Sequence, residues 1–241
     1  MINPAATPSP DALPPRFRNL RRSIAAVAIL VVGVVAICLM AATRVPEAFR
    51  GPSFADRAGA EDAARRFVTG LSALHAAFIR EGAWEAAFAE DDINCWLATD
   101  LRRNHRDALP ESISDLRVDF RPRQVAVFTR VAAAGMRPVA VVVFGVRLRE
   151  PNQLGVTVEQ ASLGAIPLPG GPILAEARRR FDRLGMVTSV RQLDGRSVLV
   201  VYIPSTHESG GPSHWLESLS IADGSMAVAG RTLVRGETEA R

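Results

Sequence analysis

The sequence predicts an α+β domain held outside the cytoplasm by one N-terminal transmembrane helix. Three observations lead to this fold class. A run of nineteen residues without a charge, 24–42, lies near the N-terminus. Later segments place apolar residues at three- and four-residue spacing, as on one face of a helix. The segments between them alternate apolar and polar residues, which is typical of strands with one buried face.

The charge-free run predicts a membrane-spanning helix over residues 23–43. At 1.5 Å per residue, such a helix spans about 30 Å, the thickness of the hydrocarbon core of a bilayer. A cleaved signal peptide is the alternative, but its apolar region is shorter. A lipoprotein signal at Cys38 would need a small residue where Ile37 stands. An uncleaved anchor therefore fits the sequence best.

Flanking charge predicts the orientation of this anchor. Basic and acidic residues are mixed after the run. Before it, four arginines lie within seven residues: Arg16, Arg18, Arg21 and Arg22. By the positive-inside rule the N-terminus stays in the cytoplasm. We expect a disordered Pro/Arg-rich tail over 1–22, a linker over 44–52 and an extracytoplasmic domain over 53–241, at the inner membrane of the cell.

Helical periodicity predicts about three helices in the outer domain. The first begins near Ser53, carries an apolar face through Phe78 and ends before Gly82. A short strand at 84–88 precedes a second helix, from about Asp91 to Arg103. The third helix is expected between Pro172, which suits the first helical position, and Gly185, a typical C-terminal stop.

Alternating segments predict an antiparallel sheet. Four strands follow one another with short turns, which favours a meander: 116–120, 125–131, 137–149 and 154–158. After the third helix, four more are expected at 188–193, 197–203, 215–221 and 226–233. The dipeptide at 223–224 is Asp-Gly, the preferred turn of a two-residue hairpin.

Composition excludes several classes of function. All 29 basic residues are arginines, so mechanisms that need a P-loop lysine or a Schiff-base lysine are excluded. The net charge is +4, and most of this excess lies in residues 1–22. The outer domain is therefore close to neutral, which argues against a nucleic-acid partner. No motif indicates a cofactor.

Two clusters could carry chemistry, and each has a structural interpretation. Glu90, Asp91 and Asp92 could bind a metal, but no histidine lies three or four residues away, and acidic side chains also stabilise a helix start. Cys95 could act as a thiol nucleophile, with His207 or His214 as its base; these two histidines are expected in a loop rich in Ser, Gly and Pro. Because it lies inside a helix among acidic residues, we expect a raised pKa and a packed structural role.

The third helix carries a candidate membrane-contact site. Four arginines occupy its last two turns: Arg178, Arg179, Arg180 and Arg183. They could compensate the helix dipole and form a solvated face. The alternative is contact with anionic lipid headgroups, because the linker to the membrane is short.

The segment 88–97, FAEDDINCWL, combines a short strand, an acidic helix start and an Ile-Asn-x-x-Leu pattern. Together with LGAIPLP at 163–169 and the helix after it, this segment resembles the YpmS-like group of uncharacterised single-pass membrane proteins. The chain is more distantly similar to tubular (TULIP-like) lipid-binding envelope domains. The resemblance covers about residues 54–233. It implies a non-enzymatic domain that binds an apolar ligand, and it supplies no catalytic residue.

These inferences favour a single-pass protein whose outer domain binds lipid or another apolar molecule. The strand near 139–148 supports this hypothesis, because it is apolar on both faces. An interaction or scaffold module of envelope machinery, docking another envelope protein, is the alternative. A thiol or metal hydrolase is the third hypothesis.

Overall fold

The computed structural model describes residues 49, 57–104, 110–132, 135–193, 195–205 and 213–233. The predicted tail 1–22, the predicted transmembrane helix 23–43 and all of the linker 44–52 except Phe49 lie outside these ranges. Within them, no helix has both the length and the apolar character needed to cross a bilayer.

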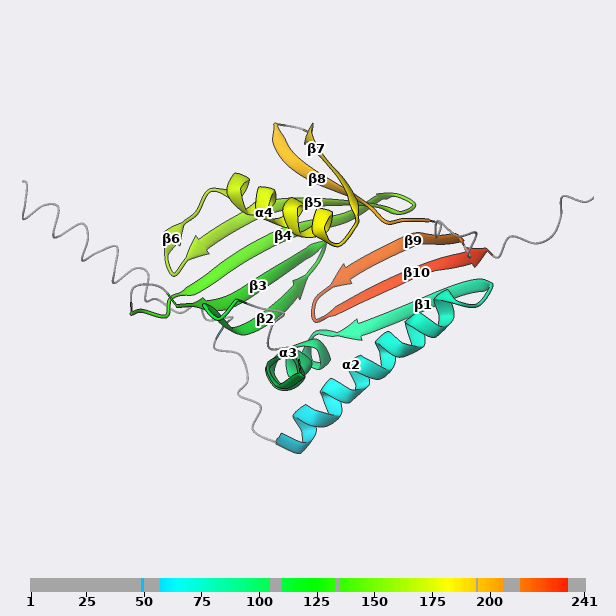
Figure 1. The fold of residues 1–241 in the computed structure, drawn as a ribbon, viewed down its shortest axis with the longest axis horizontal. Helices are drawn as coiled ribbons and strands as arrows, with labels where there is room; N and C mark the ends of the chain where they lie inside the picture. The colour runs from blue at the N-terminus through cyan, green and yellow to red at the C-terminus, as the bar shows by residue number, and fades with distance from the viewer. Residues whose placement is uncertain are drawn as a thin grey trace, which may run out of the picture. The chain divides into compact units, whose positions relative to one another are not determined.

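The described part of the chain is α+β, with three helices and ten strands (Figure 1). The helices are α2 (Arg57–Phe78), α3 (Glu90–Asn104) and α4 (Gly170–Arg183). The strands are β1 (Gly82–Ala89), β2 (Ile113–Arg121), β3 (Gln124–Val131), β4 (Val139–Glu150), β5 (Gln153–Leu163), β6 (Ile166–Pro167), β7 (Val187–Leu193), β8 (Arg196–Tyr202), β9 (Ser213–Ala222) and β10 (Ser225–Leu233).

The strands form two antiparallel sheets (Figure 1). The larger sheet has the order β2-β3-β4-β5-β8-β7, with β6 paired to β5. Its first four strands form the meander that the sequence predicts. The smaller sheet has the order β1-β10-β9. Here β1 pairs with β10 along its whole length, from Gly82 opposite Thr232 to Ala89 opposite Ser225. No local pattern in the sequence predicts this second sheet.

Strand β4 supports packing on both of its faces. Val139, Val141 and Val143 are buried in a cluster with Ala126 and Phe128 of β3. The intervening residues point to the opposite face because strand side chains alternate. There Phe144 packs with residues of β5, β8 and α4, including the buried Leu174 and Leu199. The apolar character of both faces therefore comes from a core on each side.

Helices α2 and α3 pack together through small side chains. Ala60, Ala63 and Ala64 of α2 form a buried cluster with Cys95 of α3, and Trp96 packs against it. Side chains of this size allow two helix backbones to approach closely. Farther along α2, the ring of Phe67 lies 5.4 Å from that of Trp96 and 5.6 Å from that of Phe88 on β1.

The N-terminal turn of α3 is tied to its neighbours by polar side chains. The Glu90 carboxylate accepts a hydrogen bond from the backbone N–H of Phe120 at 2.6 Å. Asn94 pairs with the backbone of Val118 as donor and as acceptor, both at 2.8 Å. Asp92 and Arg66 of α2 form an ion pair at 2.6 Å. These side chains thus join α3 to β2 and to α2, beyond stabilising a helix start.

Phe49 packs against the larger sheet. It is 6% exposed, and its ring lies 6.3 Å from that of Phe128. The guanidinium groups of Arg117 and Arg130 each lie 5.2 Å from the centre of the Phe49 ring, within the range of a cation–π interaction. Arg117 also donates a hydrogen bond to the Phe49 carbonyl oxygen at 3.4 Å. The linker residue Phe49 is therefore fixed to β2 and β3.

Two local predictions are wrong, and one is confirmed. Helix α4 begins at Gly170, with Pro169 at the N-cap position, so Pro172 is its third residue rather than its first. The predicted C-terminal stop is confirmed, because Gly185 follows the helix with a φ of 76°. His214 was expected in a loop, but it lies in β9 and its ring contacts Phe78.

Candidate functional site

A cavity of about 330 Å³ lies between the two sheets. We call it the inter-sheet cavity. Its lining comes from both sheets, from the end of α2 and from the segment after β8: Leu74, Phe78, Trp84, Val125, Val146, Asn152, Leu154, Ile203, His214, Leu216, Leu219, Ile221, Met226 and Val228. Its volume falls within the range of small-molecule sites in proteins. Asn152 and His214 are the polar members, so the wall is almost entirely apolar.

Backbone and side-chain hydrogen bonds hold the two sheets together on either side of this cavity. At the β4–β5 turn, the Asn152 amide donates to the His214 carbonyl at 2.7 Å and accepts from the Leu216 N–H at 2.6 Å. Near the β2–β3 turn, Arg123 N–H donates to the Ile221 carbonyl and Gly224 N–H donates to the Phe120 carbonyl. These hydrogen bonds fix the distance between the two sheets at both turns.

Aromatic packing closes the α2 side of the cavity. The rings of Phe78 and Trp84 meet edge to face at 4.6 Å, and the Phe78 ring lies 5.4 Å from that of His214. Gly230, which pairs with Trp84, leaves room for the indole. A Cβ at Gly230 would overlap the Trp215 carbonyl oxygen and lie 2.5 Å from Trp84 Cζ2.

Asn152 and His214, the two polar residues of the wall, are engaged within the protein. Asn152 uses its amide oxygen and its amide nitrogen on the backbone of β9. His214 Nδ1 lies 3.1 Å from the Thr232 hydroxyl oxygen. The buried indole N–H of Trp84 has no oxygen acceptor among the described residues. The cavity is therefore suited to an apolar molecule, bound through shape and burial rather than through charge.

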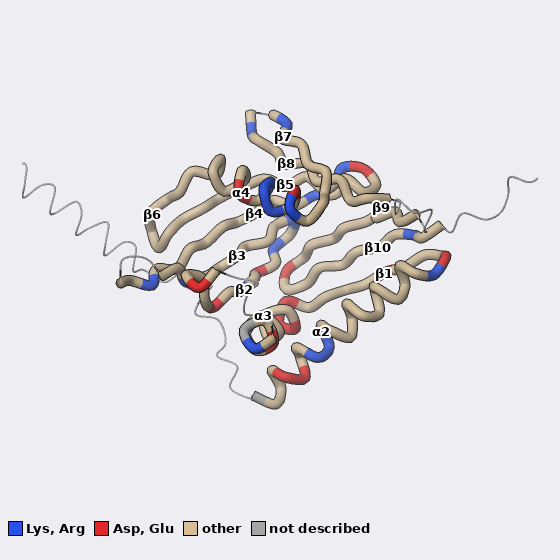
Figure 2. The backbone as a smooth tube through the Cα atoms, viewed as in Figure 1, with Lys and Arg blue, Asp and Glu red and all other residues tan. Residues whose placement is uncertain are grey.

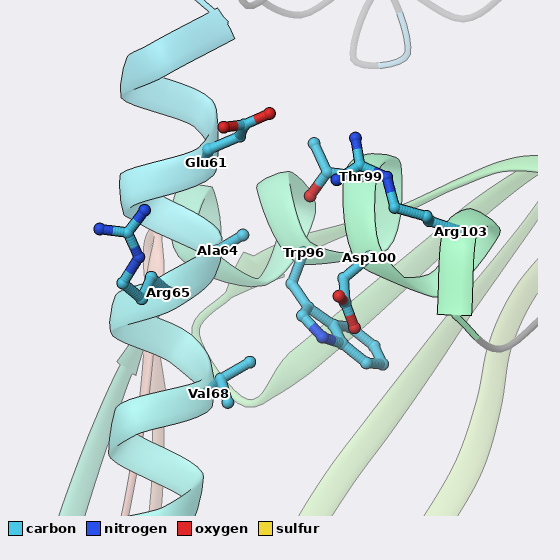
Figure 3. A pocket seen from close by; sticks show the side chains of 8 residues that line it. All are labelled: Glu61, Ala64, Arg65, Val68, Trp96, Thr99, Asp100 and Arg103. Atoms are coloured by element: carbon cyan, nitrogen blue, oxygen red, sulfur yellow. The ribbon is translucent and has the colours of Figure 1, made fainter.

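A second hollow, of about 320 Å³, lies between α2 and α3. Figure 3 shows its side chains, which come from one face of each helix. Trp96 and Val68 supply apolar surface, while the rim carries opposite charges: Glu61, Arg65, Asp100 and Arg103. Because Glu61, Trp96 and Asp100 already have partners in the protein, this groove offers little to a ligand.

The four arginines predicted as a lipid-contact site lie on α4, where acidic side chains accompany them (Figure 2). Glu176 pairs with Arg179 at 2.7 Å, with Arg180 at 3.1 Å and with Arg183 at 3.4 Å. Arg178 pairs with Asp182 at 3.6 Å. The arginine headgroups hold the pKa of the Glu176 carboxyl below its ordinary value. The four arginines and their two acidic partners therefore carry a net charge of +2.

The predicted burial of Cys95 is confirmed. Its side chain is 3% exposed. Burial raises the pKa of the Cys95 thiol above its ordinary value, and the carboxylates of Asp91 and Asp92 raise it further. His207, one of the two bases weighed for it, lies outside the described residues, and His214 is part of the inter-sheet cavity. These conditions disfavour a thiolate nucleophile.

The acidic residues at the start of α3 do not gather into a metal site. Among the described residues, no three His, Cys, Asp or Glu side chains are placed to hold a metal ion. Burial raises the pKa of the Glu90 carboxyl above its ordinary value. The hydrogen bond from the Phe120 N–H acts in the opposite direction, but the effect of burial is larger.

No family model matches the chain, and no curated protein or solved structure matches it either. The resemblance to YpmS-like and TULIP-like proteins therefore rests on the short motifs of the sequence alone.

Proposed function

We propose that the protein is a membrane-anchored, non-enzymatic binder of a lipid or another apolar molecule, and that the ligand occupies the inter-sheet cavity. The observation that carries this proposal is a cavity with apolar walls in the middle of the domain. Several of the large apolar side chains that line it, such as Leu154 and Met226, are only partly buried by the protein. A ligand would complete their burial.

The size of the cavity supports occupation. An engineered apolar cavity of about 150 Å³ binds benzene, so this cavity has room for a ligand roughly twice that size, such as part of an acyl chain.

The surroundings of α4 support a location beside a membrane. Leu184 and Val187, at the turn from α4 into β7, are 72% and 67% exposed. Exposed apolar side chains next to arginines are typical of surfaces that contact anionic lipid. In this proposal, Arg178, Arg179, Arg180 and Arg183 face lipid headgroups, and residues 23–43 anchor the chain with its N-terminus in the cytoplasm.

Native mass spectrometry of the full chain, extracted in mild detergent, tests the ligand. We expect a non-covalent adduct in the lipid mass range that organic extraction removes. Val228 lines the cavity on β10, so Val228→Trp should fill the space and abolish the adduct. Val190→Trp is the matched control, because Val190 is 43% exposed on β7 and lies outside the cavity.

Absence of an adduct from the wild-type chain, or equal occupancy in Val228→Trp and wild type, would refute the proposal. The topology is tested separately. A reporter that is active only outside the cytoplasm, fused after Arg241, should give a signal, and its silence would overturn the proposed localisation.

A further inference from the structure

A hollow on the larger sheet has a different chemical character from the inter-sheet cavity. Its volume is about 700 Å³, and ten residues of β4, β5 and the β7–β8 hairpin line it: Gly145, Arg147, Leu148, Arg149, Gly155, Thr157, Glu159, Leu193, Arg196 and Val198. We call it the arginine trough. Three arginines and one glutamate line the trough, so its net charge is +2.

The single acid of the trough is already engaged. Arg196 Nη1 lies 2.8 Å from Glu159 Oε2, and the Thr157 hydroxyl donates to Glu159 Oε1 at 2.8 Å. Arg147 and Arg149 have no carboxylate within ion-pair distance among the described residues, and both are exposed. The excess positive charge of the trough therefore lies on Arg147 and Arg149.

The position of these two arginines suits one anion. The two arginines lie on one face of the sheet, because Arg147 pairs with Gly155 and Arg149 Cδ lies 3.1 Å from the position that a Cβ of Gly155 would take. Strand pairing is irregular at Arg149, between Leu148 and Glu150. Like charges that lie close together on one face of a sheet repel each other, and an anion bound between them relieves that repulsion. Guanidinium groups bind phosphate through paired hydrogen bonds, so two flexible arginines can hold one phosphate group between them.

Two glycines keep the floor of the trough open. A Cβ at Gly145 would lie 2.5 Å from Thr157 Oγ1 and 2.7 Å from Glu159 Oε1. A Cβ at Gly155 would lie 3.1 Å from Cδ of Arg149. Side chains at either position would therefore displace the groups that shape the trough. Leu148, Leu193 and Val198 add apolar wall beside the charges.

We propose that the arginine trough binds a phosphate group, held by Arg147 and Arg149 and carried by a molecule whose apolar part contacts the neighbouring leucine and valine side chains. This site is independent of the inter-sheet cavity. The phosphate has two possible sources: a free phosphorylated small molecule or the headgroup of a phospholipid.

Isothermal titration of the full chain in neutral detergent tests this site with three probes. These are inorganic phosphate, dihexanoyl phosphatidic acid and, as the zwitterionic control, dihexanoyl phosphatidylcholine. Binding of inorganic phosphate indicates a free phosphorylated ligand, and binding of phosphatidic acid alone indicates a lipid headgroup. No binding of either, or equal binding of the zwitterionic lipid, would overturn the proposal.

Variants distinguish a built site from general surface charge. The double variant Arg147→Gln, Arg149→Gln should lose at least about tenfold in affinity for the bound probe. The matched control Arg121→Gln, Arg231→Gln removes two exposed arginines from other strands and should change affinity less than about twofold. Glu159→Gln frees Arg196 and should tighten binding. An equal loss in both double variants would refute the site. Thermal unfolding of each variant verifies that it is folded.

Discussion

The side-chain amide of Asn152 and the backbone of Leu216 join the two sheets. The side-chain oxygen of Asn152, Oδ1, accepts a hydrogen bond from the backbone N–H of Leu216 at 2.6 Å. The backbone N–H of Asn152 donates to the Leu216 carbonyl oxygen at 3.1 Å. Asn152 is 7% exposed and has a φ of 62°, a conformation that asparagine tolerates better than most residues. One residue therefore makes the β4–β5 turn and holds β9 beside it.

Replacing this residue should loosen the contact between the sheets. Asn152→Ala leaves the buried Leu216 N–H and the His214 carbonyl without their side-chain partner, and it places alanine at a positive φ. We expect a loss of about 3 kcal/mol in the free energy of unfolding. Asn152→Gly loses the same bonds but tolerates the backbone conformation, so it should lose about 1 kcal/mol less. Chemical denaturation followed by tryptophan fluorescence measures both, and a glycine variant as stable as wild type would show that the bonds contribute nothing.

Glu90 should make the stability of the domain depend on pH. Because burial raises its pKa in the folded protein, the folded state retains a proton that the unfolded state releases first. Wild type should therefore lose stability relative to Glu90→Gln as the pH rises from about 4.5 through the raised pKa, and the gap should vanish at lower pH.

Two variants of Glu90 separate the effect of its charge from the effect of its hydrogen bond. Glutamine can still accept the Phe120 N–H, whereas alanine cannot. At neutral pH, Glu90→Ala should be less stable than Glu90→Gln by about 1–3 kcal/mol. Thermal unfolding between pH 4 and pH 8 compares the three chains. Parallel curves for wild type and Glu90→Gln would contradict the predicted titration.

Cys95 should be slow to react in the folded protein. Its thiol is buried, and its raised pKa keeps it protonated at neutral pH. Iodoacetamide should label the peptide that contains Cys95 far more slowly in the native chain than in urea. Peptide mapping by mass spectrometry separates this site from Cys38. Rapid native labelling at pH 7 would restore the hypothesis of a thiol enzyme.

Gly230 should not accept a side chain. A methyl group there meets the Trp215 carbonyl oxygen and the indole of Trp84. Gly230→Ala should cost about 1–3 kcal/mol and shift the tryptophan emission, because Trp84 must move. Gly224→Ala is a useful contrast, since no atom lies near its Cβ position and its cost comes from a φ of 71° alone. An unchanged spectrum for Gly230→Ala would refute this account of Trp84 packing.

The sequence predicted most elements because their signals are local. Helical spacing located α2 and α4, and alternation with short turns located the strands from β2 to β5. The pairing of β1 with β10 joins residues about 140 positions apart, and no local pattern encodes it. The inter-sheet cavity depends on that pairing, so its residues could not be selected in advance. The apolar pattern on both faces of β4, which favoured an apolar site in the sequence, reflects the two cores that pack against it.

The position of Phe49 would limit how far a membrane-anchored domain can move. If residues 23–43 cross a bilayer, Phe49 is only the sixth residue after Thr43, and its ring contacts Arg117 and Arg130. Fully extended, six residues reach roughly 20 Å. Such a tether would keep the domain near its own membrane and would prevent it from carrying cargo to a distant one. Any apolar ligand would then have to arrive from the adjacent lipid or be delivered by another carrier.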